Sequence, residues 1–573
     1  MGKKTNGLIL LLFAVAILTG CSGRRGTVTI RVVATSDVHG RFYANDCIDG
    51  SEREGSMAKL SAFLKRERDE YRHLIYLDAG DILAGSIEIY HDITAEFYEP
   101  SLAATVYNML GCDAAVFGNH DIKVGAEVYY RFLNGCNFPL LGANLKYDSY
   151  GDFLPPYVII EKHGVKIAVV GMTTPAVNYT VPADIVGTVT VSDIVESAQY
   201  WLPVIRENED PDVVIGLLHS GYDNGRFDEL GVEENAVRRL AAEVPGFDCL
   251  IYGHDHIPYE GKVASLDGDS VLVINPGPYA SKAAVITVTA GFRKRELQEL
   301  SVSGSLADLS AYEPDPDFAR SLNSRYETVC HYADSVIGVL DVALDSRGAL
   351  WGNTTAMDYI HYHQMRFQAA EVSIATPISS ERIEAGNFTI RDAFRFYPFE
   401  NNLVSVMMKG SEIESILEFS ASQFYNTVTD GTEQLLRPAG PIGNSSSIGL
   451  QTMKMFMSAA GIRYVIDVTK PAGEMVSVIS MSDGTPFVPD KYYRTTFNSH
   501  LAGDAYSPLY QVPGIARDDI RRRTVTASGA DLRYYLITDF FVRQETGKNV
   551  VVPDYDNWRI IPEKIVNRYL SNE

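Results

Sequence analysis

Five apolar segments of this 573-residue chain each run directly into residues that commonly bind metal ions. Each segment has the length and composition of a buried strand. The residues that follow them are, in chain order, Asp37-Val38-His39, Gly80-Asp81, Gly118-Asn119-His120-Asp121, His219 and Gly253-His254-Asp255-His256. Because open α/β sheets bind ligands at the carboxyl ends of their strands, we expect these side chains to meet at one edge.

Carboxylate, imidazole and amide donors in this combination suit Zn, Mn, Fe or Co better than Ca. The candidate ligands are Asp37, His39, Asp81, Asn119, His219, His254 and His256. Seven donors are too many for one tetrahedral site, but they fit two divalent ions about 3.5–4 Å apart that share a carboxylate. Asp81 is the natural bridge. Any one of these residues alone would usually be structural, whereas five such motifs in succession are hard to obtain by chance.

The succession of motifs resembles the signature of the calcineurin-like metallophosphoesterases. Residues 80–86 are similar to the branch that holds bacterial 5'-nucleotidases and 2',3'-cyclic-nucleotide phosphodiesterases. Segments 351–355, 385–386, 397–399 and 497–506 are similar to the C-terminal substrate-binding domain of the same family. The resemblance implies that Asp37, His39, Asp81 and His256 hold one ion, and that Asp81, Asn119, His219 and His254 hold the other.

The resemblance also implies a reaction in which hydroxide, generated from water on the ions, attacks phosphorus. His120 would stabilise the developing charge or protonate the leaving alkoxide. Asp121 either orients His120 or is a solvated turn residue. The 5'-nucleotidase branch carries an acid three residues after this histidine, where this chain has Lys123. The partner that orients His120 is therefore an open question.

Two further acidic residues and one short segment lie close to these motifs in the sequence, and each is either structural or part of the site. We expect Asp78 to be structural, whereas Asp255 either supports its neighbouring ligands or is exposed. Residues 275–279, Asn-Pro-Gly-Pro-Tyr, either border the metal site or form a plain turn.

In the family that the chain resembles, the second domain selects the substrate by stacking its base between aromatic rings. Such stacking contributes about 1–3 kcal/mol and tolerates different bases. Phe497 and Tyr506, which flank the loop containing Asp504, are candidates for one face. Phe456 or Phe424 would supply the other, although each of these rings is also a natural core residue.

Residues 375–380, Ala-Thr-Pro-Ile-Ser-Ser, replace a glycine-rich stretch whose arginine binds phosphate in the 5'-nucleotidase branch. A phosphomonoester dianion loses a bidentate partner without that arginine, whereas a singly charged cyclic diester needs it less. This departure favours 2',3'-cyclic nucleotides and 3'-nucleotides as substrates. The alternatives are a 5'-nucleotidase or UDP-sugar hydrolase, a hydrolase of sulfur compounds, and a surface lipoprotein that binds ligands without catalysis.

The chain starts like an exported protein. Lys3 and Lys4 precede an apolar run that is too short to cross a bilayer, and Leu18-Thr19-Gly20-Cys21 resembles a bacterial lipobox. We expect cleavage of residues 1–20, lipidation of Cys21, and a location in the cell envelope, either periplasmic or on the cell surface. The other cysteines number five, so at least one is free or pairs between chains. We expect Cys112, Cys136 and Cys249 to be core residues.

Charge argues against a duplex nucleic-acid partner. The formal net charge is −23, and loss of Lys3 and Lys4 with residues 1–20, which hold no acid, makes it −25. Duplex binding needs a basic surface. Small nucleotides remain acceptable partners because metal ions supply local positive charge. We expect a monomer, and the sequence leaves an oligomer open.

Periodicity predicts two domains in an α/β (α+β) fold. A two-sheet metallophosphoesterase sandwich flanked by helices occupies residues 27–302, and a linker with a helix over 318–333 occupies residues 303–335. A C-terminal α/β substrate-binding domain follows over residues 336–573. Within the first domain, apolar spacing predicts one amphipathic helix over residues 94–110.

Overall fold

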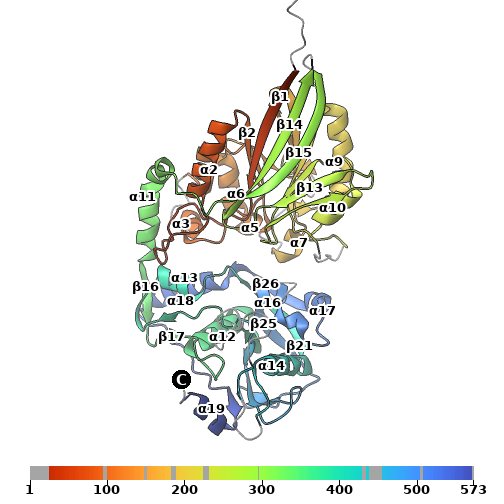
Figure 1. Cartoon of the computed structure of the whole chain (residues 1–573). Coiled ribbons are helices and arrows are strands. Elements are labelled where there is room, and N and C mark those ends of the chain that lie inside the picture. The colour runs from red at the N-terminus through yellow and green to blue at the C-terminus, as the bar shows by residue number, and fades with distance from the viewer. Residues whose placement is uncertain are drawn as a thin grey trace, which may run out of the picture.

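The computed structural model describes residues 25–94, 100–147, 151–181, 189–223, 231–293, 296–428, 434–437, 454–503 and 507–570. Two domains are stacked end to end, and helix α11 (Pro316–Ala333) runs along one side from the first to the second (Figure 1). The predicted α/β class, with an N-terminal sandwich and a C-terminal α/β domain, is confirmed.

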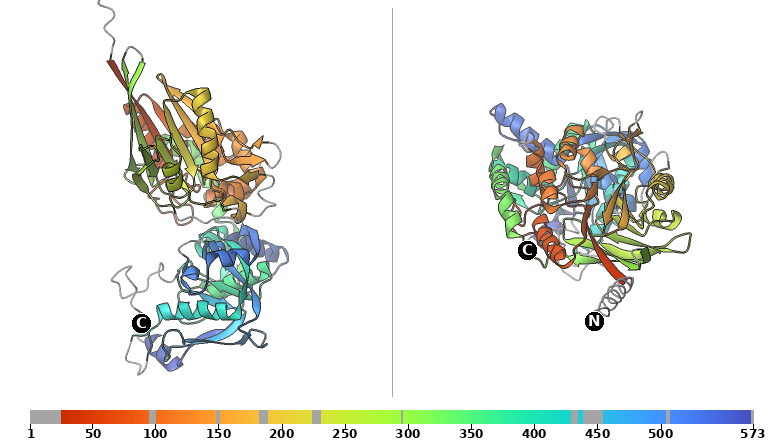
Figure 2. Two further views of the ribbon diagram at one scale, coloured as in Figure 1. Left: turned by 90° about the vertical axis from the view of Figure 1, so that its right-hand side faces the viewer. Right: turned by 90° about the horizontal axis from the view of Figure 1, so that it is seen from above.

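Two six-stranded mixed sheets form the first domain. The first sheet has the order β15 (Glu296–Asp308), β14 (Lys282–Arg293), β1 (Arg25–Thr35), β2 (Leu74–Asp78), β3 (Ala114–Val116) and β4 (Leu140–Leu141). The second has the order β12 (Tyr259–Ala264), β13 (Ser270–Asn275), β11 (Cys249–Tyr252), β10 (Val213–His219), β8 (Val165–Thr173) and β7 (Tyr157–Lys162). Figure 2 shows the sheets as two layers with helices outside them.

Side-chain alternation along the strands divides the core of the first domain into layers. On β1, Ile30, Val32 and Ala34 pack between the two sheets, while Val33 packs toward the outer helices. This period of two is the natural consequence of the pleated backbone. The outer helices are α2 (Met57–Glu70), α4 (Leu102–Leu110), α6 (Ala126–Gly135), α9 (Ile194–Glu209) and α10 (Val237–Glu243).

Parallel pairing brings the carboxyl ends of the ligand-bearing strands to one edge. β1 pairs in parallel with β2, and β2 with β3. In the other sheet β10 pairs in parallel with both β8 and β11. The shared edge faces the second domain (Figure 1). Loops at the ends of both sheets are thereby placed beside one another.

The predicted helix over residues 94–110 is shorter than expected. α3 (Ile87–Thr94) ends where that helix was predicted to begin, and residues 95–99 lie outside the described residues. α4 starts only at Leu102, because the Ser101 hydroxyl accepts a hydrogen bond from the Ala104 amide and caps the helix there. Apolar spacing identified the buried face correctly but did not reveal the cap.

The connector starts later than predicted. β15 stays paired with β14 as far as Asp308, six residues beyond the predicted domain end at residue 302. The Asp315 carboxylate then caps α11, and it also accepts hydrogen bonds from Ser61 and Lys65 of α2. The start of α11 is therefore fastened to the first domain.

The second domain is built on a five-stranded sheet and a three-stranded sheet. The larger has the order β22 (Ser458–Ala460), β18 (Val372–Ala375), β25 (Tyr492–Asn498), β21 (Asn402–Lys409) and β26 (Thr524–Asp531). The smaller has the order β24 (Val476–Met481), β23 (Ile462–Asp467) and β27 (Trp558–Ile561). The main helices are α12 (Thr355–Gln368), α13 (Ile390–Phe396), α14 (Gly410–Phe424), α18 (Leu532–Glu545) and α19 (Glu563–Leu570), and β16 (Val336–Leu340) pairs with β20 (Gly386–Thr389) beside them.

A single apolar cluster joins the two domains. It contains Cys47 and Ile87 from the first domain, Val329 from α11, and Phe394 from α13. The guanidinium of Arg391, also on α13, donates hydrogen bonds to the carbonyl oxygens of the loop that carries Cys47. The domains are thus in direct contact as well as connected by α11.

A disulfide between Cys47 and Cys330 fastens that loop to α11, a pairing that the sequence did not predict. Cys112 and Cys249 are buried and free, as predicted for core residues, while Cys136 is free and only partly buried. Cys21 and the rest of residues 1–24 lie outside the described residues. Within the described residues, no helix combines the length and apolar content that crossing a bilayer requires.

We predict that Cys330→Ser lowers the unfolding free energy of the oxidised protein by about 2–5 kcal/mol, because the bridge closes a very long loop in the unfolded chain. Thermal melts with and without reductant measure this. Reductant should lower the Tm of the parent and leave that of Cys330→Ser unchanged. Cys136→Ser is the control and should melt like the parent; a parent insensitive to reductant would contradict the prediction.

Candidate metal centre

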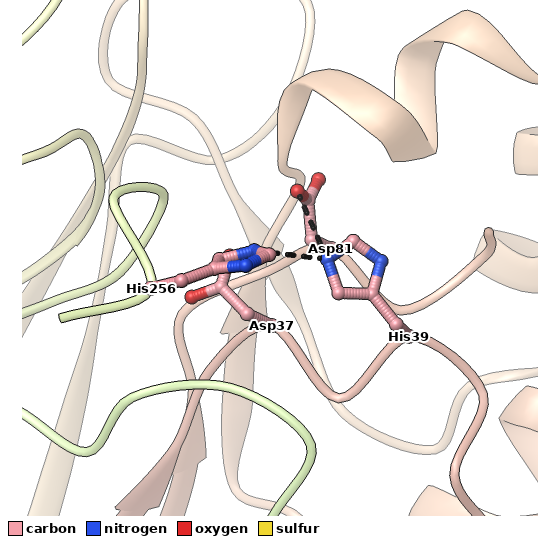
Figure 3. A group of neighbouring side chains, drawn as sticks. All are labelled: Asp37, His39, Asp81 and His256. Carbon is pink, nitrogen blue, oxygen red and sulfur yellow. Dashed lines mark hydrogen bonds and ion pairs between the residues drawn. The ribbon is translucent and has the colours of Figure 1, made fainter. Parts of the chain in front are cut away.

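The first predicted ligand set converges at the edge that faces the second domain. Donor atoms of Asp37, His39, Asp81 and His256 all lie within 4.8 Å of one another (Figure 3). His39 Nε2 is 3.1 Å from His256 Nε2, and His256 Nε2 is 3.3 Å from Asp37 Oδ1. The four donors come from three loops, those after β1, β2 and β11.

The second predicted set lies against the first. The Oδ1 atom of Asn119 is 3.1 Å from His219 Nε2 and 2.9 Å from His254 Nδ1. Asp81 Oδ2 is 3.3 Å from His219 Nε2 and 3.8 Å from His39 Nε2, so this one oxygen faces both sets. All seven residues predicted as ligands are therefore brought together, and Asp81 lies at their junction.

Hydrogen bonds orient three of the imidazoles. The Nδ1–H group of His39 donates to the Ala84 carbonyl at 3.2 Å, and that of His219 donates to the Ala79 carbonyl at 2.8 Å. His254 uses its Nε2 atom instead, 3.1 Å from the Glu234 carboxylate. Each ring is left with one nitrogen directed into the site, an arrangement typical of metal-ligating histidines. Glu234 belongs to no motif, and sequence reasoning missed it.

The backbone of the ligand loops is unusual. Five of the seven ligand residues have positive φ, namely Asp37, His39, Asp81, His254 and His256. This left-handed region is disfavoured for residues with a Cβ, and such strain gathers at functional sites. Gly118 is required for a different reason, since a Cβ there would lie 2.0 Å from Asp81 Oδ1.

The donor set fits divalent cations. A neutral imidazole whose one nitrogen donates has only a lone pair on the other, so His219 and His254 would both direct lone pairs at the Asn119 oxygen unless positive charge lay between them. The pKa values of Asp81 and His219 also indicate that positive charge is favoured at this site. Burial disfavours the imidazolium form, yet Asp81 raises the pKa of His219 to about 10. Burial likewise opposes the Asp81 carboxylate, but His219 holds its pKa well below the usual range.

Asp121 does not orient His120. Its two carboxylate oxygens accept hydrogen bonds from the amides of Asp81, Ile82, Leu83 and Gly118, at 2.7–2.8 Å. The sequence offered two interpretations of Asp121, as a residue that orients His120 or as a solvated turn residue, and both are wrong. Asp121 is buried and fixes the loop that presents Asp81.

His120 lies beside the ligands, as predicted. Its backbone amide donates to Asp81 Oδ1 at 2.9 Å, and its ring meets the His39 ring edge-on with centroids 5.5 Å apart. Burial lowers its pKa to about 3, so the ring is neutral at pH 7. Among the described residues its buried Nδ1 atom has no hydrogen-bond partner. His120 is therefore placed to act on a substrate.

Two further predictions about acids are resolved. Asp78 is structural, since its carboxylate accepts hydrogen bonds from Thr35 and Tyr107. Asp255 supports its neighbours by accepting from the Tyr222 amide at 2.9 Å and the Asn275 side chain at 2.7 Å.

The segment over residues 275–279 borders the site rather than forming a distant turn. The ring centroid of Tyr279 lies 5.9 Å from those of both His39 and His256.

The predicted base-stacking residues are mostly core. Phe497 and Phe456 are 0% and 1% exposed, inside the apolar core of the second domain, and Phe424 packs against Phe456. None of the three rings is exposed to a ligand. Phe497 lies on β25, an interior strand of the larger sheet, and Phe456 and Phe424 are buried in the same apolar core. Asp504 and Tyr506 lie outside the described residues.

An exposed aromatic ring occurs elsewhere in the second domain. Phe399 is 42% exposed, with the Lys454 ammonium 4.7 Å from its ring centroid. Residues 397–399 carry part of the resemblance to the C-terminal domain, but the sequence did not point to Phe399 as a base-stacking residue.

A chain of contacts connects the second domain to His39. Arg533, which is fully buried, donates to Glu400 at 3.1 Å and to the carbonyls of Tyr397 and Pro398. Burial raises the pKa of Glu400, while Arg533, Lys123, His120 and the backbone N–H of Gly85 lower it. Gly85 follows Ala84, whose carbonyl orients His39. Glu400 thus supports a metal-ligand loop from the opposite domain.

Comparisons with known proteins agree with this geometry. Residues 30–258 match the family model described as "Calcineurin-like phosphoesterase", and residues 336–510 match "5'-nucleotidase, C-terminal domain". The solved structure of the Haemophilus influenzae NAD nucleotidase aligns with a TM-score of 0.61 at 17% identity, covering 93% of this chain and 99% of that one. A 5'-nucleotidase precursor from Thermus thermophilus aligns with a TM-score of 0.55 at 21% identity, with the same coverage. These likenesses show the fold.

Three curated relatives are similar over most of the chain. A 2',3'-cyclic-nucleotide 2'-phosphodiesterase/3'-nucleotidase from Salmonella typhimurium is 26% identical over 85% of this chain and 83% of its own length. A 5'-nucleotidase from Vibrio cholerae is 26% identical over 72% and 81%. The trifunctional nucleotide phosphoesterase YfkN from Bacillus subtilis is 24% identical over 93% of this chain, which spans 39% of that longer protein.

The sandwich with its converging carboxylate, imidazole and amide donors defines a metallophosphoesterase, and the chain is a hydrolase of that class. With the matching second domain, it belongs to the family of 5'-nucleotidases and 2',3'-cyclic-nucleotide phosphodiesterases.

We predict that His254→Ala removes about one equivalent of divalent metal per chain and lowers kcat by orders of magnitude, because the second donor set loses a ligand. Elemental analysis after dialysis measures the metal, and circular dichroism checks the fold. His73→Ala, at the opposite end of β2, is the control. Unchanged metal content in His254→Ala would remove this residue from the ligand set.

We predict that Glu400→Ala weakens metal binding by about tenfold, because supports beyond the ligands themselves contribute at that level. Competition with a chromogenic chelator measures the affinity without any substrate. Glu384→Ala is a matched control, since Glu384 also pairs with an arginine of the second domain but is exposed. Equal metal affinity in both variants would show that the contact from Glu400 does not reach the metal centre.

Proposed function

We propose that this chain hydrolyses phosphate esters of nucleotides with two divalent ions, Zn, Mn, Fe or Co, and that it prefers 2',3'-cyclic nucleotides and 3'-nucleotides. The position of Asp81 supports two ions, since one of its oxygens faces both donor sets. Bound there, divalent ions would polarise a phosphoryl oxygen and lower the pKa of water.

The protein's own groups complete the reaction. His120 is neutral and lies beside the ligands, so it can donate a hydrogen bond to charge that develops on the phosphoryl group or the leaving oxygen. The Asp121 clamp and the carbonyls of Ala79 and Ala84 hold the ligands in place before substrate binds. Such preorganisation means that the site does not need to rearrange during turnover.

The observation that carries the substrate preference is the absence of a cationic side chain from residues 375–380. The segment starts at the last residue of β18, and residues 375–379 are buried, with Ile378 in the apolar cluster and the Ser379 carbonyl accepting a hydrogen bond from the Ser346 hydroxyl. A dianionic monoester finds no guanidinium there. The Salmonella typhimurium relative, named for cyclic diesters and 3'-nucleotides, supports the same preference.

Base recognition is assigned to an exposed ring of the second domain. Phe399 precedes Glu400, on which groups of the first domain act, so its ring belongs to a segment that adjoins that domain. Stacking there would tolerate different bases. Tyr506 and Asp504 remain sequence-based candidates for the same task.

The main alternative is a 5'-nucleotidase or UDP-sugar hydrolase, which the Vibrio cholerae relative favours. It keeps the metal chemistry and requires a different phosphate-binding cation. A ligand-binding protein without catalysis does not fit, because the seven predicted ligands are all present and converge.

We further propose export and anchoring through a lipid on Cys21, with nucleotide scavenging in the cell envelope as the role. The lipobox-like Leu18-Thr19-Gly20-Cys21 supports this proposal. The chain is proposed to act as a monomer.

Substrate preference is tested with purified residues 22–573 loaded with Mn or Zn. We expect kcat/KM for 2',3'-cyclic AMP to exceed that for 5'-AMP by at least about tenfold, the loss that a missing charged hydrogen bond produces. 3'-AMP and a UDP-sugar complete the panel, and a chelator should abolish all activity. His120→Asn is the matched variant, with normal metal content and reduced kcat. Preference for 5'-AMP would overturn the assignment of residues 375–380.

A further inference from the structure

A cationic side chain beside the metal centre has no carboxylate or carbonyl partner among the described residues. The guanidinium carbon of Arg41 lies 4.5 Å from the ring centroid of Tyr279. Arg41 follows the ligand His39 by two residues. Among the described residues, its guanidinium forms no hydrogen bond or ion pair, and its side chain is only partly buried.

Tyr279 links this cation to the ligands. Its ring contacts those of His39 and His256, and its backbone amide donates to the Asp37 carbonyl at 2.8 Å. Tyr279 has a φ of 65°, which is costly for an aromatic residue. The ring is nevertheless 37% exposed, and the charge of Glu400 from the second domain acts on it. Tyr279 therefore lies on the surface between the metal ligands and the second domain.

A neighbouring arginine, Arg53, provides a comparison, because its charge is fully engaged in ion pairs within the protein. Arg53 is buried and pairs with Glu88 at 2.7 Å and with Asp46 at 3.1 Å. Those two carboxylates are the ones whose charges act on Arg41 as well, and both are engaged by Arg53. Arg41 therefore has no carboxylate of its own in this cluster. Keeping a partly buried guanidinium without a carboxylate costs free energy, which suggests that its charge has another use.

We propose that Arg41 and Tyr279 form a subsite for a second phosphate of the substrate, one carried elsewhere on the same nucleoside. The planar guanidinium presents paired N–H donors that match two phosphate oxygens, and stacking on Tyr279 fixes its plane. The Tyr279 hydroxyl, which has no hydrogen-bond partner among the described residues, adds a donor. This subsite rests on the proposed function, because it presumes that a nucleotide ester is bound at the ions.

Position selects which second phosphate fits. Among the described residues, no hydrogen bond or ion pair joins Arg41 to a ligand side chain, and the ring of Tyr279 contacts both the guanidinium and His39. A phosphate joined to the scissile one by an anhydride would stay among the ligands. The proposal places a phosphate on the opposite hydroxyl of the nucleoside, farther from the ions, at Arg41. The favoured substrate class is therefore a nucleotide with its ester at the 2',3' end and another phosphate at the 5' end.

The test compares pairs of substrates that differ by one phosphate. For the wild-type enzyme, 5'-phosphorylated adenosine 2',3'-cyclic phosphate should have a KM about tenfold or more below that of adenosine 2',3'-cyclic phosphate, since charged hydrogen bonds contribute at that level. Arg41→Gln should abolish this difference while leaving kcat/KM for the unphosphorylated substrate within about twofold, and Tyr279→Phe should reduce it. ADP against AMP forms the second pair, for which no gain is expected.

Arg66→Gln is the matched control, because Arg66 also stacks on a tyrosine, Tyr312, but on the outer surface. It should preserve the KM difference. An equal loss on both members of the first pair in Arg41→Gln, or a gain for ADP alone, would overturn the subsite as stated. Activity on the unphosphorylated substrate reports separately on the proposed function. Its absence in the wild type would reject the nucleotide assignment, and equilibrium dialysis of the 5'-phosphorylated substrate against Arg41→Gln would still test the subsite.

Discussion

The first domain depends on one carboxylate that must face two groups of donors at once. Asp81 can do so only while its loop keeps a fixed conformation, and four amides bound to Asp121 impose it. Gly118 removes a Cβ that would collide with this carboxylate. The loop after β1 is tied to the same structure, since the amides of Asp37 and His39 donate to the carbonyls of Gly80 and Asp81. The two sheets bring these loops together, and the hydrogen bonds then set the distances.

The second domain contributes to this order. α11 is fastened at its start by Asp315 and near its end by the disulfide to Cys330, so it behaves as part of the first domain. The second domain then reaches across with Glu400 to the segment that orients His39. The residues proposed to select a substrate and those proposed to hold an ion are consequently connected by a short series of contacts. A change in the contact between the domains would therefore affect both groups of residues.

The sequence predicted what local pattern can encode. Apolar strands that end in Asp, His or Asn identified seven residues that the fold brings together, because parallel strands align their carboxyl ends. Roles that depend on direction were not predictable. Asp121 adjoins His120 in sequence but points to backbone amides, and Glu234 reaches His254 from a loop without a motif.

The sequence pattern also did not show which aromatic side chains are buried in the core. Phe497 lies on an interior strand, where an aromatic residue looks the same in sequence as one that lines a binding site. The start of α4 was missed for a related reason, since a serine cap has a weak signal beside a long apolar period. The disulfide joins residues 283 positions apart, and spacing carries no information about such a pair.

The left-handed backbone at five ligand positions also restricts how this site can change over evolutionary time. If these residues bind an ion as proposed, that binding offsets the steric cost of the conformation, while most replacements keep the cost without the gain. Glycine avoids the cost, and asparagine and aspartate reduce it. Descendants that abandon the chemistry should therefore drift toward glycine or asparagine at these five positions, whereas Asn119 and His219, whose backbone is unstrained, are free to accept a wider range of residues.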